Sequence, residues 1–284
     1  MERHNLRYRT MLSDGDSTAF TAIRRAQPYG PTQLISKLEC INHCHKRIGT
    51  ALRKKAKEGR LEGRGAGKLT NDKCTRLQNY YRGAILNNLG NQEAMNYAIW
   101  ASLFHCCSTD EDPHHTRCPD GVGSRCFFKA AIAEGKPPPP HADHCGTAIS
   151  RDVFQAIVPI YKCMSSPVIL RKIAHGKTQN TNESLNNLIW VHCPKEMFMG
   201  KDRLTAAVAE AVAKFNRENS HIAQVLDFMN IPANANTLSA LEAMDTVRIK
   251  KAQRAAAAAT IQARRANSPG RQRRGDIRCW NAGR

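Results

Sequence analysis

One stretch near the N-terminus constrains the fold class more than any other. Residues 6–14 read LRYRTMLSD, with Leu, Tyr, Thr and Leu in alternation, and the polar sequence Ser-Asp-Gly-Asp closes the stretch. Alternation with a period of two is typical of a β-strand, and the acidic ending is typical of a turn. The following residues, 17–27, have helical spacing behind a Ser or Thr cap and stop before Pro28. This order predicts an α/β fold in which Asp14 lies at the carboxyl end of a strand.

Most of the remaining chain has helical periodicity. An apolar strand is expected at 34–38, and Tyr80, Tyr81 and Trp100 fall on inward faces, where we expect them to form core rather than a platform for nucleic-acid bases. The fold class is therefore α/β and mostly helical. The expected helices are 41–57, two within 72–107, 151–161, 167–175, 178–193 and one or two within 201–229.

Three segments with turn or linker composition divide this pattern. Residues 59–70 form a Gly-rich basic loop, 108–126 are rich in turn residues, and 135–145 (GKPPPPHADHC) are typical of a stiff polyproline-like linker. The C-terminal tail holds eleven Lys or Arg against Asp276 alone. We therefore expect four parts: a first part of the core at 1–58, an insertion at 59–145, a second part of the core at 146–247 and a basic, partly disordered tail at 248–284.

The charge balance favours an anionic partner. The 284 residues contain 43 Lys and Arg against 24 Asp and Glu, a formal net charge of +19. Counterion release makes nucleic acid the strongest candidate partner, although composition alone does not choose between DNA, RNA and an anionic membrane. The basic face of helix 41–57 is either solvated or in contact with phosphate, and its candidate DNA-binding residues are Lys46, Arg47, Arg53, Lys54 and Lys55. No apolar run approaches a membrane span and no signal peptide is present, so an intracellular protein without membrane contact is expected.

Cysteine and histidine usage indicates metal binding rather than disulfides. Eleven cysteines, an odd number, are mixed with eleven histidines. Loop 108–126 lacks its own apolar core, and the ligands in and near it suffice for a closed zinc site: Cys118, Cys126, His105, His114 and His115. Cys40 and His43 form a weaker candidate, because a Cys-x2-His pair supplies only two of the four ligands that zinc needs.

Five segments resemble a known family. They are YRTMLSDGDSTAF, KLECINHCHKRIGTALRK, KLTNDKCTRLQNYYRGAI, AIWASLFHCCSTDEDPHHTRCP and HGKTQNTNESLNNLIWVHCPKEMF. Together they are similar to the Mutator-like transposase domain of animal genomes, over roughly residues 6–255. The resemblance implies a ribonuclease H-like core interrupted by a helical insertion.

The resemblance also implies an Asp, Asp, Glu catalytic set that binds Mg²⁺ or Mn²⁺. Asp14 corresponds to the second acid, with Asp16 as the alternative, and Glu183 corresponds to the third. Cys40 and His43 match a Cys-x2-His signature of such transposases. The implied partner is DNA at transposon ends, the implied compartment is the nucleus, and a homo-oligomer is the implied assembly.

Two positions depart from the family pattern. The family has an earlier strand with the first aspartate, whereas only five residues precede the strand expected here and Glu2 is the sole acid among them. We therefore expect the C-terminal part of a transposase, either a fragment or a decayed or repurposed copy. Arg125 stands where a tryptophan is expected, which affects local packing. Two other functions stay open: a non-catalytic DNA-binding remnant and a zinc-dependent interaction protein.

Overall fold

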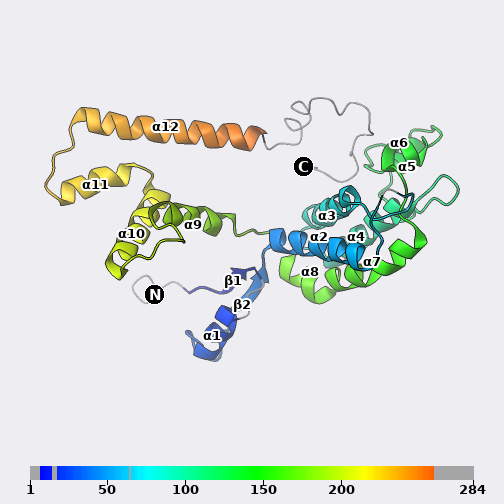
Figure 1. Cartoon of the computed structure of the whole chain (residues 1–284), viewed down its shortest axis with the longest axis horizontal. Coiled ribbons are helices and arrows are strands. Elements are labelled where there is room, and N and C mark those ends of the chain that lie inside the picture. Colours follow the sequence, from blue (N-terminus) through cyan, green and yellow to red (C-terminus); the bar gives the residue numbers. More distant parts are fainter. Residues whose placement is uncertain (1–6, 15–17, 64, 259–284) are drawn as a thin grey trace. The chain divides into compact units, whose positions relative to one another are not determined.

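The computed structural model describes residues 7–14, 18–63 and 65–258. Over these residues the chain has twelve helices and two short strands (Figure 1). The expectation of a mostly helical α/β chain is confirmed. The described residues divide into two compact units, the first ending at Thr178 and the second beginning at Gln179.

The two strands form a parallel pair at the start of the first unit. Strand β1 (Thr10–Ser13) pairs with β2 (Ser36–Glu39), with Ser13 opposite Glu39. Parallel strands need a crossover connection, and α1 (Thr18–Ala26) supplies it. Both strands are shorter than the sequence suggests because only four residues of each are paired; Leu34, expected within the second strand, is 63% exposed. Asp14 directly follows β1, as expected.

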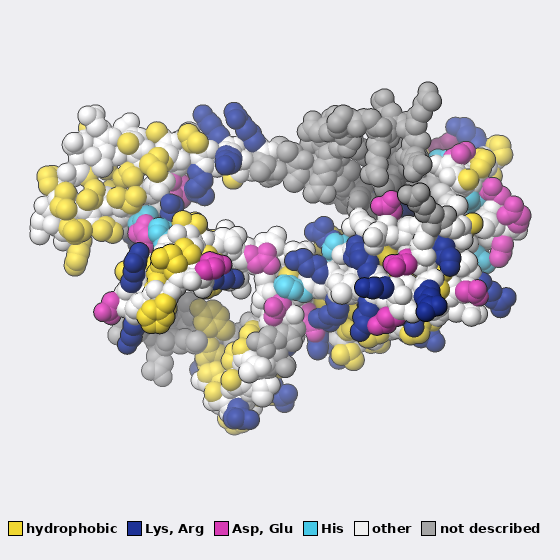
Figure 2. All heavy atoms as spheres, viewed as in Figure 1, with side chains coloured by type: hydrophobic (Ala, Val, Ile, Leu, Met, Phe, Trp, Pro, Cys, Tyr) yellow, Lys and Arg dark blue, Asp and Glu magenta, His cyan; other side chains and the backbone are white. Residues whose placement is uncertain are grey.

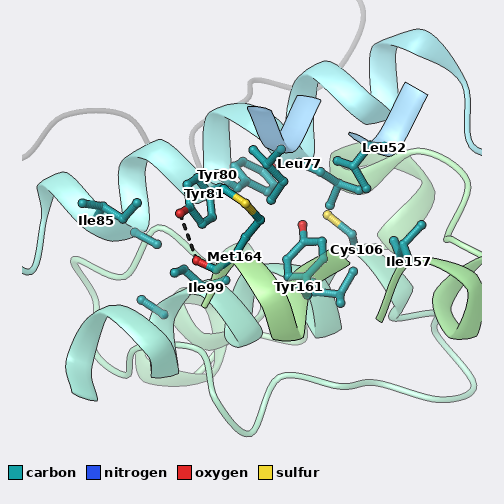
Figure 3. Close-up of a cluster of buried hydrophobic side chains, with 14 of the residues drawn as sticks. Leu52, Leu77, Tyr80, Tyr81, Ile85, Ile99, Cys106, Ile157, Tyr161 and Met164 are labelled. Carbon is teal, nitrogen blue, oxygen red and sulfur yellow. Dashed lines mark hydrogen bonds between the residues drawn. The ribbon is translucent and has the colours of Figure 1, made fainter. Parts of the chain in front are cut away.

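Five helices pack into one hydrophobic core in the first unit, and Figure 3 shows part of this core. They are α2 (Ile41–Glu58), α3 (Asn71–Leu86), α4 (Gln92–Cys107), α7 (Arg151–Met164) and α8 (Pro167–Ile173). Helix α2 shows the pattern clearly, because its buried residues recur every three to four positions: Ile41, Cys44, Ile48, Leu52 and Ala56. No single described helix has the length and hydropathy of a membrane span; α7 and α8 reach them only as a pair, bent by 56°.

Local capping explains where several of these helices begin. The side chains of Thr70, Asn91 and Ser150 accept hydrogen bonds from backbone N–H groups three residues on, at the N-termini of α3, α4 and α7.

Within the core, Tyr81 is fully buried and its hydroxyl donates to the backbone oxygen of Met164 at 3.0 Å, the dashed line in Figure 3. Tyr80 is also buried and Trp100 packs against the same cluster, so these aromatic residues are core, as predicted.

Two short helices lie after the predicted loop 108–126, and one of them falls inside the predicted linker. Helix α5 (Phe127–Ala133) follows the turn-rich loop, and α6 (His141–Cys145) lies inside the predicted linker 135–145. After α6 the chain returns to the Gly-rich loop, where Gly67 and Ile149 form an isolated parallel bridge. Gly67 has φ +76°, and a Cβ there would lie 2.7 Å from Ser150 Cβ, so only glycine fits this crossing.

The second unit is entirely helical over its described residues. It contains α9 (Asn180–His192), α10 (Lys201–Arg217), α11 (Ser220–Phe228) and α12 (Ala235–Ala258). The expected helix or helical pair at 201–229 is a pair, divided where Glu218 adopts φ 58°. Leu185, Leu188 and Ile189, at helical spacing in α9, are only half-buried, and no residue of that helix is fully buried. Helix α12 runs through position 248, and the tail beyond 258 lies outside the described residues.

Candidate metal centre

Four of the predicted zinc ligands come together in the first unit. His105 lies in the last turn of α4, His115 and Cys118 lie in loop 108–126, and Cys126 is the residue before the first turn of α5. Their nearest ligand atoms all lie within 4.8 Å of one another, and all four side chains are buried. This buried His/Cys cluster could hold a metal ion such as zinc.

The spacing of the ligand atoms matches a tetrahedral zinc ion. The two histidine Nδ1 atoms are 3.2 Å apart. Cys118 Sγ lies 3.6 Å from each Nδ1, and Cys126 Sγ lies 3.6 Å from Nδ1 of His105 and 3.3 Å from Nδ1 of His115. Zinc bonds of about 2.0–2.1 Å to nitrogen and about 2.3 Å to sulfur place tetrahedral ligand atoms about 3.4–3.8 Å apart. These five separations are therefore close to those that one zinc ion requires, and the two Sγ atoms lie within 4.8 Å of each other.

The surroundings of the cluster lower the pKa of two of its groups, His115 and Cys126, towards the deprotonated forms that bind metal ions. Burial lowers the pKa of His115, which keeps its imidazole neutral and able to donate a lone pair. The hydrogen bond between the two thiols, together with those from the histidines, lowers the pKa of Cys126, while the same bond to Cys126 and burial raise the pKa of Cys118.

A second layer of polar residues surrounds the four ligands. His115 Nε2 lies 2.8 Å from His141 Nε2, and His141 Nδ1 lies 2.6 Å from Asp110 Oδ1. On the other side, His105 Nε2 lies 3.2 Å from Cys145 Sγ. His141 and Cys145 are the two ends of α6, and both are buried. The sequence analysis missed this pair, although a His and a Cys four residues apart share one helical face, a spacing that could have indicated it.

The other predicted metal ligands are placed differently. His114 is outside the cluster: its imidazole pairs with Asp112 at 3.0 Å and its backbone N–H donates to Ser108 Oγ. The His/Cys cluster includes neither Cys40, which is buried, nor His43, which is half-buried, and no set of three ligand groups among the described residues includes either of them.

The predicted acids belong to different units. Asp14 is exposed at the carboxyl end of β1 in the first unit, and Glu183 is exposed in the first turn of α9 in the second unit. Asp16 lies outside the described residues. A third acid, Glu39, ends β2 but is buried, with Arg47 at 3.0 Å and Lys172 at 3.6 Å from its carboxylate. Its carboxylate is thus occupied by protein cations.

The basic residues of α2 differ in how they are used. Arg47 binds Glu39, and Arg53 donates to Gln78 and Thr75 of α3, so both guanidinium groups support the fold. Lys54 makes an i,i+4 pair with Glu58 at 3.7 Å, a weak surface contact. Lys46 and Lys55 are exposed. Figure 2 shows Lys and Arg mixed with Asp and Glu on the drawn face of the first unit.

Arg125, which stands in place of an expected tryptophan, borders a cavity of about 1000 Å³ beside the cluster. One guanidinium nitrogen, Nη1, is buried there without a hydrogen-bond partner among the described residues. Arg117, also at the cavity, lies over the rings of Tyr97 and Phe104 at 5.4 and 5.6 Å. Arg125 therefore lines this cavity, and its effect on local packing stays a prediction.

Comparison with known proteins identifies the N-terminal part of the chain. Residues 1–126 match the family model of Mutator-like transposases. This part of the chain is similar to Mutator-like transposases. The resemblance is therefore confirmed for β1, α1, β2 and α2–α4, and the Mutator-like match ends at Cys126, the last of the four clustered ligands. A search of curated proteins and a search of solved structures found no match.

Proposed function

We propose that the protein derives from a Mutator-like transposase, binds DNA, and contains part of a ribonuclease H-like catalytic core. The observation that carries this proposal is the position of Asp14, which follows the parallel strand β1 inside the segment that matches the family. In open α/β sheets, functional groups gather at the carboxyl ends of parallel strands. The β1–α1–β2 unit thus presents an acid where such a core needs one.

In this proposal Asp14 and Glu183 hold Mg²⁺ or Mn²⁺. Both side chains are exposed carboxylates, the oxygen ligands that hard divalent cations prefer. When bound, such ions supply activation of the attacking oxygen and stabilisation of the leaving oxygen at phosphate. Glu39 is a poor candidate for the first acid of the family's set because Arg47 and Lys172 already neutralise it.

DNA is proposed to lie along the exposed side of α2. Lys46, Lys54 and Lys55 are solvent-exposed there, whereas the opposite face of the helix is buried in the core. Lysine contacts to phosphate position a duplex without reading its sequence. We expect the protein to act in the nucleus on transposon ends, and two ends joined together would require a homo-oligomer.

The catalytic part of the proposal is tested by DNA nicking with the full chain and Mg²⁺. We expect nicking that is lost in Asp14→Asn and in Glu183→Gln and retained in Asp72→Asn, which changes another exposed acid in the first turn of a helix. Nicking that survives either of the first two substitutions would show that the acids are wrongly assigned. Binding without nicking by the unsubstituted chain would favour the non-catalytic DNA-binding alternative.

The DNA contact is tested through its salt dependence. Each phosphate contact contributes a slope of about 0.9 in the logarithm of affinity against the logarithm of salt concentration. The double variant Lys46→Gln, Lys55→Gln should therefore reduce the slope by about 1.8. A matched double variant, Lys136→Gln, Lys162→Gln, removes two exposed lysines far from α2 in sequence and should leave the slope unchanged. Equal slopes in all three proteins would refute the α2 contact.

A further inference from the structure

We propose that His105, His115, Cys118 and Cys126 bind one structural zinc ion through both histidine Nδ1 atoms, and that His141 and Cys145 support the ligands from α6. The proposal is independent of the DNA-binding function above. Four protein ligands leave no open position, which is the mark of a structural rather than a catalytic zinc site.

The loop that carries two of the ligands needs such a crosslink. Between residues 109 and 125 only His115 and Cys118 are buried, so this segment has almost no apolar core. The aromatic residues that follow cover the cluster instead: the Phe128 ring stacks on His115 at 4.4 Å between centroids, and Phe127 meets His105 edge-on at 5.8 Å. A loop without a core is held in one conformation when its polar groups share an ion.

Coordination through Nδ1 gives every hydrogen bond around the site a defined direction. With Nδ1 bound to metal, each ligand histidine carries its proton on Nε2. His115 Nε2–H then donates to His141 Nε2, which leaves the His141 proton on Nδ1 to be donated to Asp110. This chain of metal, histidine, histidine and carboxylate is an extended form of the support that metal-bound histidines usually receive.

The second ligand histidine is supported in the same way. His105 Nε2–H points at Cys145 Sγ, which accepts. Arg76 of α3 in turn donates to the backbone oxygen of Cys145, so the end of α6 is fixed from two sides. Because both supporting side chains belong to α6, binding of the ion would hold the proline-rich segment 137–140 against the end of α4.

Charge balance also favours the ion. Two buried thiolates would be costly on their own, whereas two thiolates, two neutral imidazoles and Zn²⁺ sum to zero net charge. Asp110, the charged end of the chain of hydrogen bonds, remains at the surface with its side chain 56% exposed. The buried part of the site is therefore neutral and its negative charge faces solvent.

The experiment measures zinc in the purified full chain by plasma mass spectrometry. One zinc per chain is expected, with loss of the metal in Cys118→Ser and in Cys126→Ser. The matched controls are His114→Gln, which changes the imidazole next to His115, and Cys163→Ser, which changes an exposed thiol. An unsubstituted chain without zinc, Cys118→Ser with full zinc, or His114→Gln without it would each overturn the assignment.

A second measurement covers the case in which the cysteine variants do not fold. Chelation of the unsubstituted chain should increase tryptic cleavage after Arg117 and Arg125 in the loop, and leave cleavage after Arg217 in the second unit unchanged. Equal cleavage of the loop with and without chelator would overturn the structural role.

The supporting layer has its own test. His141→Gln should weaken zinc affinity by about 10–100-fold in a chelator competition, the usual effect of losing such a partner. Asp110→Asn should weaken it less, because the amide oxygen still accepts the hydrogen bond but carries no charge. Asp112→Asn, at the neighbouring exposed acid that pairs with His114, should have no effect. An affinity of His141→Gln equal to that of the unsubstituted chain would refute the support from α6.

Discussion

The two units of the molecule differ in how they bury apolar side chains. In the first unit, five helices enclose a continuous core with fully buried residues such as Leu77, Tyr81 and Ile99. In the second, fully or nearly fully buried positions are few, and Phe198 and Phe228 are 99% and 89% exposed. Figure 2 shows hydrophobic side chains spread over the surface of α10, α11 and α12. The first unit is therefore stabilised by apolar burial, and the second depends more on individual polar contacts.

Those polar contacts can be named. Asn219, at the start of α11, is buried and its side-chain amide donates to Asp245 of α12 at 2.7 Å. His221 is also buried and lies 2.8 Å from Glu210 of α10. A buried polar group that loses its partner costs more than the same contact contributes when made. We therefore expect loss of a single polar side chain to lower the stability of the second unit, as loss of a single buried apolar side chain lowers that of the first.

The largest effect is expected from a cavity in the first core. Leu77→Ala should lower the free energy of unfolding by about 2–5 kcal/mol, because burial is lost and a void remains. Val247→Ala in α12, where the side chain is 67% exposed, should change it by less than about 0.5 kcal/mol. Denaturant unfolding, monitored by hydrogen exchange, reports the stability of each unit separately. Equal losses of stability from the two substitutions would show that the two units do not differ in this respect.

Zinc removal should be the next largest effect and should be confined to the first unit. A ligand present at about a hundred times its dissociation constant stabilises the state that binds it by about 2.7 kcal/mol. Calorimetry with and without chelator should therefore show a lower melting temperature for the first unit alone. A shift of the second unit by the same amount would mean that the metal acts elsewhere.

The second unit should respond to loss of Asp245. Asp245→Ala leaves the buried Asn219 without its acceptor, and we expect a cost of about 1–3 kcal/mol. Glu242→Ala, three residues away on the same helix and exposed, is the matched control and should have little effect. Faster hydrogen exchange in α11 would report the loss. If Asp245→Ala behaves like Glu242→Ala, polar contacts do not hold this unit together.

The smallest effect is expected at Glu39, and it should depend on pH. Burial alone would raise the pKa of Glu39, but Arg47 and Lys172 outweigh burial and hold it below its usual range. A lowered pKa contributes stability above the unfolded-state pKa, and this stability is lost as the pH falls through the folded-state value. Glu39→Gln should cost about 1 kcal/mol near neutral pH, since both cations are partly exposed.

The pH dependence gives Glu39 its own control. Unfolding of Glu39→Gln and of the unsubstituted chain should be compared over a pH series. The difference in stability should shrink towards acidic pH and vanish below the lowered pKa. A difference that stays constant across the series would mean that the side chain acts through packing rather than through its charge.

The helical core could be predicted from sequence because its signal is local. Ile48 and Leu52 recur at helical spacing, and the structure buries both. The position of Asp14 at the end of β1 could be predicted for the same reason, because the alternation typical of a strand stops there. Local periodicity specifies which face of an element is buried, so these features needed no knowledge of distant contacts.

The metal centre could be predicted only in part. His114 and His115 are adjacent imidazoles in a loop, and only the path of that loop decides which one points inward. His141 and Cys145 were missed because the four prolines before them indicated a linker, whereas the short helix after the prolines returns to α4. Contacts between residues far apart in sequence depend on chain reversal, which periodicity does not encode.

The bridge between Gly67 and Ile149 has a consequence for how this chain could change over time. The chain from α3 to α6 lies between Gly67 and Ile149, and these two residues are paired. The segments before and after this insertion are therefore adjacent in space. An insertion of this kind can become longer or shorter, or acquire an ion-binding loop, while the distance between its two ends stays the same. Replacing Gly67 with a larger residue would break the pairing that holds these two ends together.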